Sequence, residues 1–179
     1  YGEGKRISIF TSYSQQVGFD PSLEAEIKTA DVVFLNINDY CREYIPIIHQ
    51  YHPLVVVDIH DYIVGNPYHQ DFINAADILF VSGVHVDNKK SFLMDHIVGK
   101  KAVIITKGKN GSIAIDEHRN IYEQNAYTKL PYQDANGAGD TFATAFTIRY
   151  LKKKQFKDAL KFASIAAAMA CSSQKLYHP

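Results

Sequence analysis

The densest group of residues able to do chemistry is the segment from Asp134 to Phe142, which reads D-A-N-G-A-G-D-T-F. Gly137 and Gly139 have no Cβ, so a ligand can come close to their backbone. A strongly helical stretch follows. The amides of Gly137, Ala138 and Gly139 would stand at its N-terminus, where free N–H groups and the helix dipole favour an anion. The segment therefore predicts a site for a phosphate or a similar anion.

The carboxylate of Asp140 falls inside the first turn of the same helix. An acidic residue is common at that place, but beside a bound phosphate it would repel the ligand. A general base that takes a proton from an attacking hydroxyl would explain its presence. The pattern thus indicates phosphoryl transfer. The alternative is that the glycines form a plain loop and Asp140 simply begins a helix.

A second glycine-bearing turn, T-K-G-K-N-G-S from Thr106 to Ser112, follows the apolar run at 102–105. Open α/β sheets bind ligands at the carboxyl ends of their strands, so two such turns on one scaffold favour a nucleotide site. The P-loop pattern G-x-x-x-x-G-K-[ST] does not occur. The dinucleotide pattern G-x-G-x-x-G fails as well, because Phe142 stands where its third glycine is needed and no strand follows. A Rossmann oxidoreductase is therefore disfavoured.

The elements expected to position these residues alternate between apolar strands and helices. The strands are predicted at 7–11, 32–35, 54–58, 78–81 and 102–106, and the helices at 21–27, 40–51, 88–98, 139–154 and 156–171. Most of these strands are apolar throughout, which indicates a parallel sheet with helices on both faces. A hairpin about His118 and Arg119 predicts an antiparallel edge. The Ala-rich last helix is expected to be buried nearly all round.

Length and composition favour a single globular domain over residues 1–179. Lys plus Arg and Asp plus Glu both number 19, which argues against nucleic acid or anionic membrane as a partner. No apolar run approaches the roughly 20 residues of a membrane helix. The two cysteines, Cys41 and Cys171, fit thiols of a cytoplasmic protein that pack in its interior better than a disulfide scaffold.

Segment 134–142 resembles the C-terminal signature of the PfkB/ribokinase family of carbohydrate and nucleoside kinases, D-T-x-G-A-G-D followed by a small residue and Phe. Only Ala135 departs, standing where the family has Thr. Residues 106–111 resemble the family's T-x-G-x-x-G nucleotide loop, and 159–168 resemble its Ala-rich helix beside the adenine. The resemblance runs from about residue 5 to the end. It implies an α/β fold of the ribokinase-like kind, three layers (α/β/α) around a mostly parallel central sheet.

The resemblance also implies an ATP-dependent kinase that uses Mg²⁺ and phosphorylates a hydroxyl of a sugar or nucleoside. Asp140 would be the catalytic base, and the amides of Gly137, Ala138 and Gly139 would form the anion hole. Asp134 matches a residue linked to a monovalent cation such as K⁺. The residues expected to hold the nucleotide are Thr106, Lys107, Gly108, Gly111, Asn136 and Ser164.

Two features depart from the family pattern. The family carries N-x-x-E after the strand that corresponds to 78–81, with the Glu helping to organise Mg²⁺, whereas this chain has S-G-V-H at 82–85. Family members also begin with a segment that carries a Gly-Gly pair, substrate-binding residues and a β-sheet lid through which dimers form. The chain has no Gly-Gly pair. We therefore expect the C-terminal portion of a PfkB-type kinase, with the N-terminal part and lid missing and a homodimer in the complete protein. The alternative is a nucleotide-binding but catalytically weak regulatory or assembly module.

Two other groups of polar residues could carry chemistry. The run D-I-H-D from Asp58 to Asp61 follows a predicted strand at the functional edge of the sheet, and a functional and a structural interpretation are equally open. His49 and His52 lie three residues apart at the end of the helix predicted at 40–51. Histidine at a helix C-terminus is favoured by the dipole, so this explanation is preferred over a metal pair.

Overall fold

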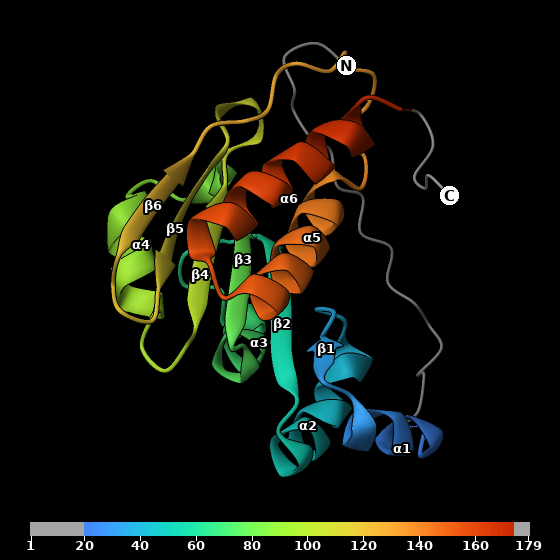
Figure 1. The fold of residues 1–179 in the computed structure, drawn as a ribbon. Helices are drawn as coiled ribbons and strands as arrows, with labels where there is room; N and C mark the ends of the chain where they lie inside the picture. Colours follow the sequence, from blue (N-terminus) through green and yellow to red (C-terminus); the bar gives the residue numbers. More distant parts are fainter. Residues whose placement is uncertain (1–19, 174–179) are drawn as a thin grey trace.

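The computed structural model describes residues 20–173, and the strand predicted at 7–11 lies outside them. Strands and helices alternate along the described part of the chain, as Figure 1 shows. The strands are β1 (Val32–Phe34), β2 (Leu54–Asp61), β3 (Ile78–Ser82), β4 (Ala102–Thr106), β5 (Ser112–Asp116) and β6 (Ile121–Gln124). The α-helices are α1 (Ser22–Thr29), α2 (Ile45–Tyr51), α3 (Gln70–Ala75), α4 (Lys89–His96), α5 (Ala138–Lys153) and α6 (Phe156–Cys171).

The strands form one sheet in the order β1-β2-β3-β4-β5-β6. Strands β1 to β4 are parallel, and β5 and β6 add an antiparallel edge, which confirms both predictions from the sequence. Because β1 to β4 run the same way, their carboxyl ends meet at one edge of the sheet. This is the edge at which open α/β sheets bind ligands.

Helices cover both faces of the sheet and give three layers (Figure 1). Alternate side chains of each inner strand point to opposite faces. Val57 packs in a cluster with residues of α1 to α4, including Phe72, whereas Phe80 and Ile104 pack against α5 and α6. The inner strands are therefore buried on both faces, which explains why they are apolar throughout.

The β5–β6 hairpin is fixed by the carboxylate of Asp116. This group accepts hydrogen bonds from the N–H of His118 (3.0 Å), the N–H of Asn120 (2.9 Å) and the hydroxyl of Tyr122 (2.8 Å). Burial raises the pKa of Asp116, but these hydrogen bonds outweigh it and hold the pKa below its ordinary value. The turn about His118 and Arg119 is thus confirmed, with Arg119 in a left-handed conformation (φ 63°).

Two helical regions differ from the sequence predictions. The helix predicted at 40–51 is a 3₁₀ helix over Asp39–Tyr44 followed by α2, whose first turn contains Pro46. Proline has no N–H to donate, so it suits the start of an α-helix and not its interior. Helix α3 was not predicted; it follows a 3₁₀ turn at Pro67–His69.

The prediction that α6 is buried nearly all round is wrong. Phe162 is 43% exposed and Met169 is 51% exposed, whereas Ala159, Leu160 and Ala163 are buried. Helix α6 lies in an outer layer, so only the side toward α5 and the sheet is covered (Figure 1). Its alanines allow close packing on that side. Every helix within residues 20–173 is too short or too polar to cross a membrane.

Candidate active site

The N-terminus of α5 lies beside the carboxyl ends of β1 and β2. Gly137 precedes the helix with φ 71° and ψ 0°, a left-handed conformation that glycine adopts without strain. The N–H of Ala138 donates to the carbonyl of Ala135 at 3.2 Å. The N–H groups of Gly139 and Asp140 have no hydrogen-bond partner among residues 20–173. Two amides are thus free at the positive end of a 16-residue helix, which suits an anion.

A cavity of about 260 Å³ separates this end of α5 from the strand ends. Asp140 lines the cavity and is exposed, and its carboxylate makes no hydrogen bond or ion pair with any residue from 20 to 173. A carboxylate in that situation can accept a proton from a bound hydroxyl. The other lining residues come from β1, β2 and α5: Phe34, Leu35, Asn36, Val56, Asp58, His60, Ala143 and Thr144.

Strand β2 is irregular where it borders this cavity. Its register with β3 shifts between Asp58 and Asp61, which pair with Phe80 and Ser82, so β2 carries one extra residue. His60 lies in this bulge with φ 53°, and its N–H donates to the Asp58 carboxylate at 2.8 Å. β-Bulges next to active sites redirect side chains. Here the bulge sits where Asp58 and His60 line the same cavity as Asp140.

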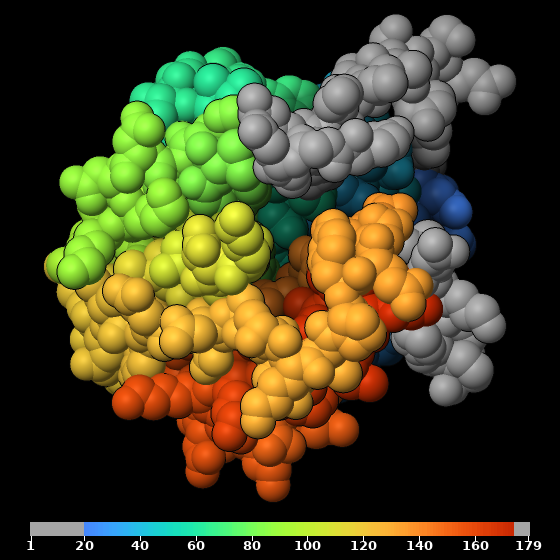
Figure 2. All heavy atoms as spheres, turned by 90° about the horizontal axis from the view of Figure 1, so that it is seen from above, coloured from blue at the N-terminus to red at the C-terminus, as the bar shows by residue number. Residues whose placement is uncertain are grey.

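The glycine turn predicted to bind a nucleotide follows β4 and contains a 3₁₀ helix at Gly108–Asn110. The N–H of Lys107 donates to the carbonyl of Gly111 at 2.7 Å, and its ammonium lies 3.7 Å from the carboxylate of Glu123. Figure 2 shows this edge of the molecule from above, with the yellow atoms near residue 110 and the orange atoms near residue 135 on opposite sides of a recess. The two glycine turns therefore border one hollowed surface.

Gly111 and Ser164 both shape the segment that follows β6. Gly111 has φ 80°, and a Cβ there would lie 1.9 Å from the carbonyl oxygen of Gln124. The buried hydroxyl of Ser164 donates to the carbonyl of Asn125 and accepts from the N–H of Tyr127, both at 3.1 Å. These contacts give both residues a structural role that needs no ligand. Their contact with a nucleotide stays a prediction.

The segment before α5 is anchored to the end of α6. The N–H groups of Gln133 and Asp134 donate to the carbonyl of Cys171 at 2.8 and 3.2 Å, and the Asp134 carboxylate accepts from the N–H of Asn136 at 3.1 Å. Burial, and then the negative charge of Asp134, raises the pKa of the Cys171 thiol. The predicted cation contact of Asp134 and nucleotide contact of Asn136 stay predictions.

The loop after β3 holds the sequence S-G-V-H in place of N-x-x-E. It forms a 3₁₀ turn at Gly83–His85, and a Cβ on Gly83 would lie 2.9 Å from the carbonyl oxygen of Thr106. The hydroxyl of Thr106 in turn donates to the carbonyl of Val81 at 3.4 Å. The loop is thus pressed against the end of β4, and it places the exposed His85 where the family motif carries its carboxylate.

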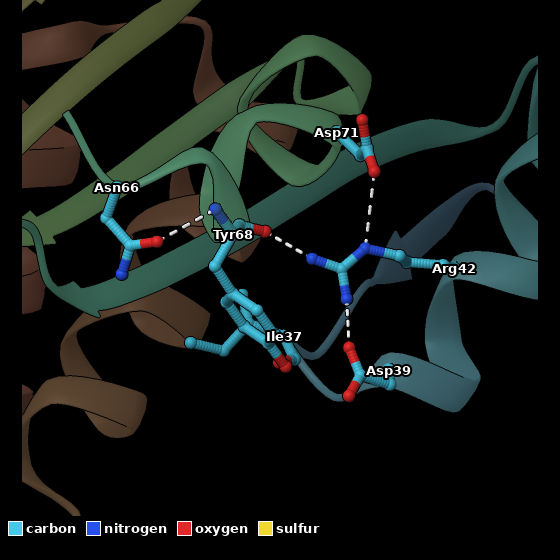
Figure 3. A network of polar contacts seen from close by, with 6 residues as sticks. All are labelled: Ile37, Asp39, Arg42, Asn66, Tyr68 and Asp71. Atoms are coloured by element: carbon cyan, nitrogen blue, oxygen red, sulfur yellow. Dashed lines mark hydrogen bonds and ion pairs between the residues drawn. The ribbon is translucent and has the colours of Figure 1, made fainter.

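The loops after β1 and β2 are tied together by Arg42, as Figure 3 shows. Its guanidinium donates to the carboxylates of Asp39 and Asp71 and to the carbonyl of Tyr68, and it stacks over the Tyr68 ring at 4.3 Å. The Tyr68 hydroxyl donates to the carbonyl of Ile37 at 2.8 Å. This network fixes the two loops that leave the cavity-lining ends of β1 and β2.

A second hollow, of about 340 Å³, lies at the opposite end of the sheet. It mixes both signs of charge, from Asp77, Lys100, Lys101, Glu117 and Arg119. The Lys100 ammonium already donates to the carbonyl of Ala76 at 3.1 Å, and burial lowers its pKa. This hollow is at the amino ends of β3 and β4, away from the edge where sheets of this kind bind ligands.

Comparison with known protein families matches residues 71–179 to the pfkB family of carbohydrate kinases. The chain belongs to this family. Among curated PfkB relatives, fructoselysine 6-kinase from Escherichia coli (strain K12) is 28% identical over 177 residues, which cover 95% of this chain and 65% of that enzyme. Ribokinase from Arabidopsis thaliana is 31% identical over 74 residues, covering 41% of this chain and 20% of that enzyme.

Solved PfkB-type structures confirm the ribokinase-like fold. A microbiome-derived acarbose kinase, Mak1, superposes with a TM-score of 0.85 at 24% identity, covering 99% of this chain and 62% of that one. Arabidopsis thaliana ribokinase complexed with ribose and ATP gives a TM-score of 0.72 at 19% identity, covering 88% and 55%. The chain thus spans less than two thirds of the length of these relatives.

The sequence predicts a site at Asp140 but does not indicate most of the cavity that this residue lines. Asn36 lies 104 positions before Asp140 and was not singled out. A usable signal was present, because Asn36 directly follows the apolar run at 32–35 and must therefore stand near the carboxyl end of a parallel strand. The run from Asp58 to Asp61 carries the same signal, and the structure places two of its residues, Asp58 and His60, at the cavity.

Proposed function

We propose that this PfkB chain transfers the γ-phosphoryl group of ATP to a hydroxyl of a sugar or nucleoside, and that residues 1–179 act as one domain. The observation that carries the proposal is the position of Asp140, exposed in a cavity of about 260 Å³ at the start of α5. Its carboxylate takes the proton of the attacking hydroxyl. The backbone N–H groups of Gly137, Ala138 and Gly139 stabilise the charge that develops on the transferred group, the N–H of Ala138 after leaving the carbonyl of Ala135.

The residues present fit ATP with Mg²⁺. ATP supplies the phosphoryl group, and Mg²⁺ usually binds phosphates, waters and one or two carboxylates. The free amides of Gly139 and Asp140 suit the phosphates, and the phosphate oxygens and bound waters would supply most ligands of the cation. Residues 20–173 hold no cluster of three or more metal-binding side chains, so the cation would arrive with the nucleotide.

The test is the Asp140→Asn variant, assayed for phosphoryl transfer and for ATP binding. Loss of a general base should lower kcat by about 10²- to 10⁴-fold. ATP affinity should stay the same or rise, because a negative charge beside the phosphates is removed. The control is Asp31→Asn, which alters an exposed carboxylate next to the amino end of β1, at the opposite edge of the sheet. A rate close to that of the unaltered protein in Asp140→Asn would show that Asp140 is not the base.

A second function has one observation in its favour. The tight S-G-V-H turn after β3 offers no carboxylate for Mg²⁺, which is compatible with a nucleotide-binding module of weak activity that serves in regulation or assembly. Calorimetry with ATP, together with a product assay over a broad panel of sugars and nucleosides, separates the two. Binding without product favours the module, and product that depends on Asp140 favours the kinase.

A further inference from the structure

His60 holds a backbone conformation that costs free energy. A non-glycine residue in the left-handed region is strained, and such strain collects at functional sites. In His60 the φ of 53° is maintained by the bulge of β2 and by the N–H bond to Asp58. The same carboxylate oxygen lies 3.7 Å from Nδ1 of the His60 ring. The Asp58 carboxylate therefore accepts a hydrogen bond from the backbone of this residue and lies near its imidazole.

The cavity that contains His60 mixes hydrogen-bond donors, acceptors and apolar surface. His60 and Asn36 bring nitrogen donors, Asp58 and Asp140 bring carboxylate acceptors, and the half-exposed ring of Phe34 brings an apolar wall. A hydroxyl both donates and accepts, so a compound with several neighbouring hydroxyls can satisfy such a lining. The cavity wall therefore matches a polyhydroxylated molecule.

The charge of the cavity lining determines which reactant can contact His60. Among residues 20–173, two carboxylates line the same cavity, and no lysine or arginine does. A nucleotide phosphate placed among them would be repelled, whereas a neutral hydroxyl would not. The free amides at the start of α5 offer the phosphates a better place. The imidazole is thus left for the neutral acceptor.

We propose that His60 is a specificity-determining contact for the acceptor. Its imidazole hydrogen-bonds a hydroxyl that neighbours the one Asp140 deprotonates, and the Asp58 carboxylate lies beside the ring. This inference rests on the proposed kinase function and names one residue that selects the acceptor, a polyol with adjacent hydroxyl groups. In this proposal the function of the strained bulge is to place the imidazole at the cavity.

The test measures equilibrium binding of D-ribose, D-fructose and adenosine to the full chain and to His60→Gly. In the unaltered protein at least one probe should bind and shift the ring resonances of His60 in NMR spectra. Its affinity should fall about 10- to 100-fold in His60→Gly, as expected for one lost hydrogen bond. ATP affinity should stay within twofold, and the melting temperature should not fall, because glycine relieves the strain.

His52→Gly is the matched control. His52 has nearly the same backbone (φ 55°), is exposed and ends α2 before β2 begins, at the far end of that strand. Equal probe affinity in His60→Gly and His52→Gly would overturn the proposal. So would a fall in ATP affinity instead of probe affinity, or a failure of all three probes to bind and shift the His60 resonances.

The kinase proposal can fail separately from this one. Binding is measured without turnover, so it can be repeated in the Asp140→Asn variant. If the protein transfers no phosphoryl group but binds a probe in a way that depends on His60, the kinase proposal is refuted and the acceptor contact is supported. Transfer that depends on Asp140 but not on His60, with unchanged KM for the acceptor, would refute the contact and support the kinase.

Discussion

Replacing Gly111 by Ala should unfold the protein far more readily than the same change at Gly108. Both glycines belong to the turn after β4, and both have positive φ, 80° at Gly111 and 53° at Gly108. They differ in surroundings. A Cβ on Gly108 meets nothing within 4 Å, whereas a Cβ on Gly111 would lie 1.9 Å from the carbonyl oxygen of Gln124 and 2.7 Å from the backbone nitrogen of Ala126.

The size of the effect follows from two terms. The backbone of Gly111 (φ 80°, ψ −132°) is one that an alanine adopts at a cost of about 1–3 kcal/mol. Overpacking against a backbone that must move adds about 1–3 kcal/mol. We expect Gly111→Ala to lower the free energy of unfolding by about 4 kcal/mol, or the melting temperature by about 8–16 °C. Gly108→Ala should lower the free energy of unfolding only by the strain of an alanine in the left-handed region, about 1–2 kcal/mol.

Urea unfolding followed by circular dichroism measures both variants. Ser164 provides a further check, because its hydroxyl holds Asn125 and Tyr127 and so keeps the obstructing segment in place. If Ser164 holds the segment, the Gly111→Ala and Ser164→Ala changes should cost less together than the sum of their separate costs. Equal losses in Gly111→Ala and Gly108→Ala would refute the reasoning and show that the segment after β6 yields freely.

Two further predictions concern titratable side chains whose pKa is shifted in the folded protein. Asp116→Asn should lower the free energy of unfolding by about 2–4 kcal/mol at pH 7, because the carboxylate accepts bonds from His118, Asn120 and Tyr122. Since the folded pKa of Asp116 lies below 3.8, this difference should shrink as the pH falls below that value, and a constant difference in urea titrations would contradict it. Burial, helped by the charges of Arg42 and His60, lowers the pKa of His69 below 6.5. As the pH falls through 6.5, His69 is therefore protonated in the unfolded chain before it is protonated in the folded protein, which lowers the free energy of unfolding. This free energy should fall less steeply with decreasing pH in His69→Gln than in the unaltered protein. Equal slopes in urea titrations of the two proteins would exclude this role.

The elements that the sequence predicted best are those whose burial can be inferred from a few consecutive residues. The runs at 78–81 and 102–106 are buried on both faces, and both became inner parallel strands. Helix α6 was placed at its observed bounds, Phe156–Cys171, because the Ala-rich pattern is local. Its exposed side was not foreseen, since the number of neighbours that cover a helix depends on the layer to which it belongs.

The features that escaped prediction depend on distant partners. The bulge of β2 exists only relative to the register of β3, so nothing in the run from Asp58 to Asp61 reveals it. The cavity forms where three separate segments meet, and the positive φ of His60 follows from that same bulge. The turn at Gly137 could be predicted, because glycine is the residue that adopts a left-handed conformation most readily and a helical sequence follows directly.

The two carboxylates in the cavity differ in their contacts, which bears on the proposed reaction. Asp58 already accepts the N–H of His60 at 2.8 Å, so it serves the bulge. Asp140 makes no hydrogen bond or ion pair within residues 20–173 and stands next to the free amides of α5. A general base needs an oxygen close to the group that receives the nucleophile, so within residues 20–173 this geometry favours Asp140 over Asp58 for the proposed role. In the proposed reaction the anion is held by backbone amides, because no lysine or arginine among residues 20–173 lines the cavity.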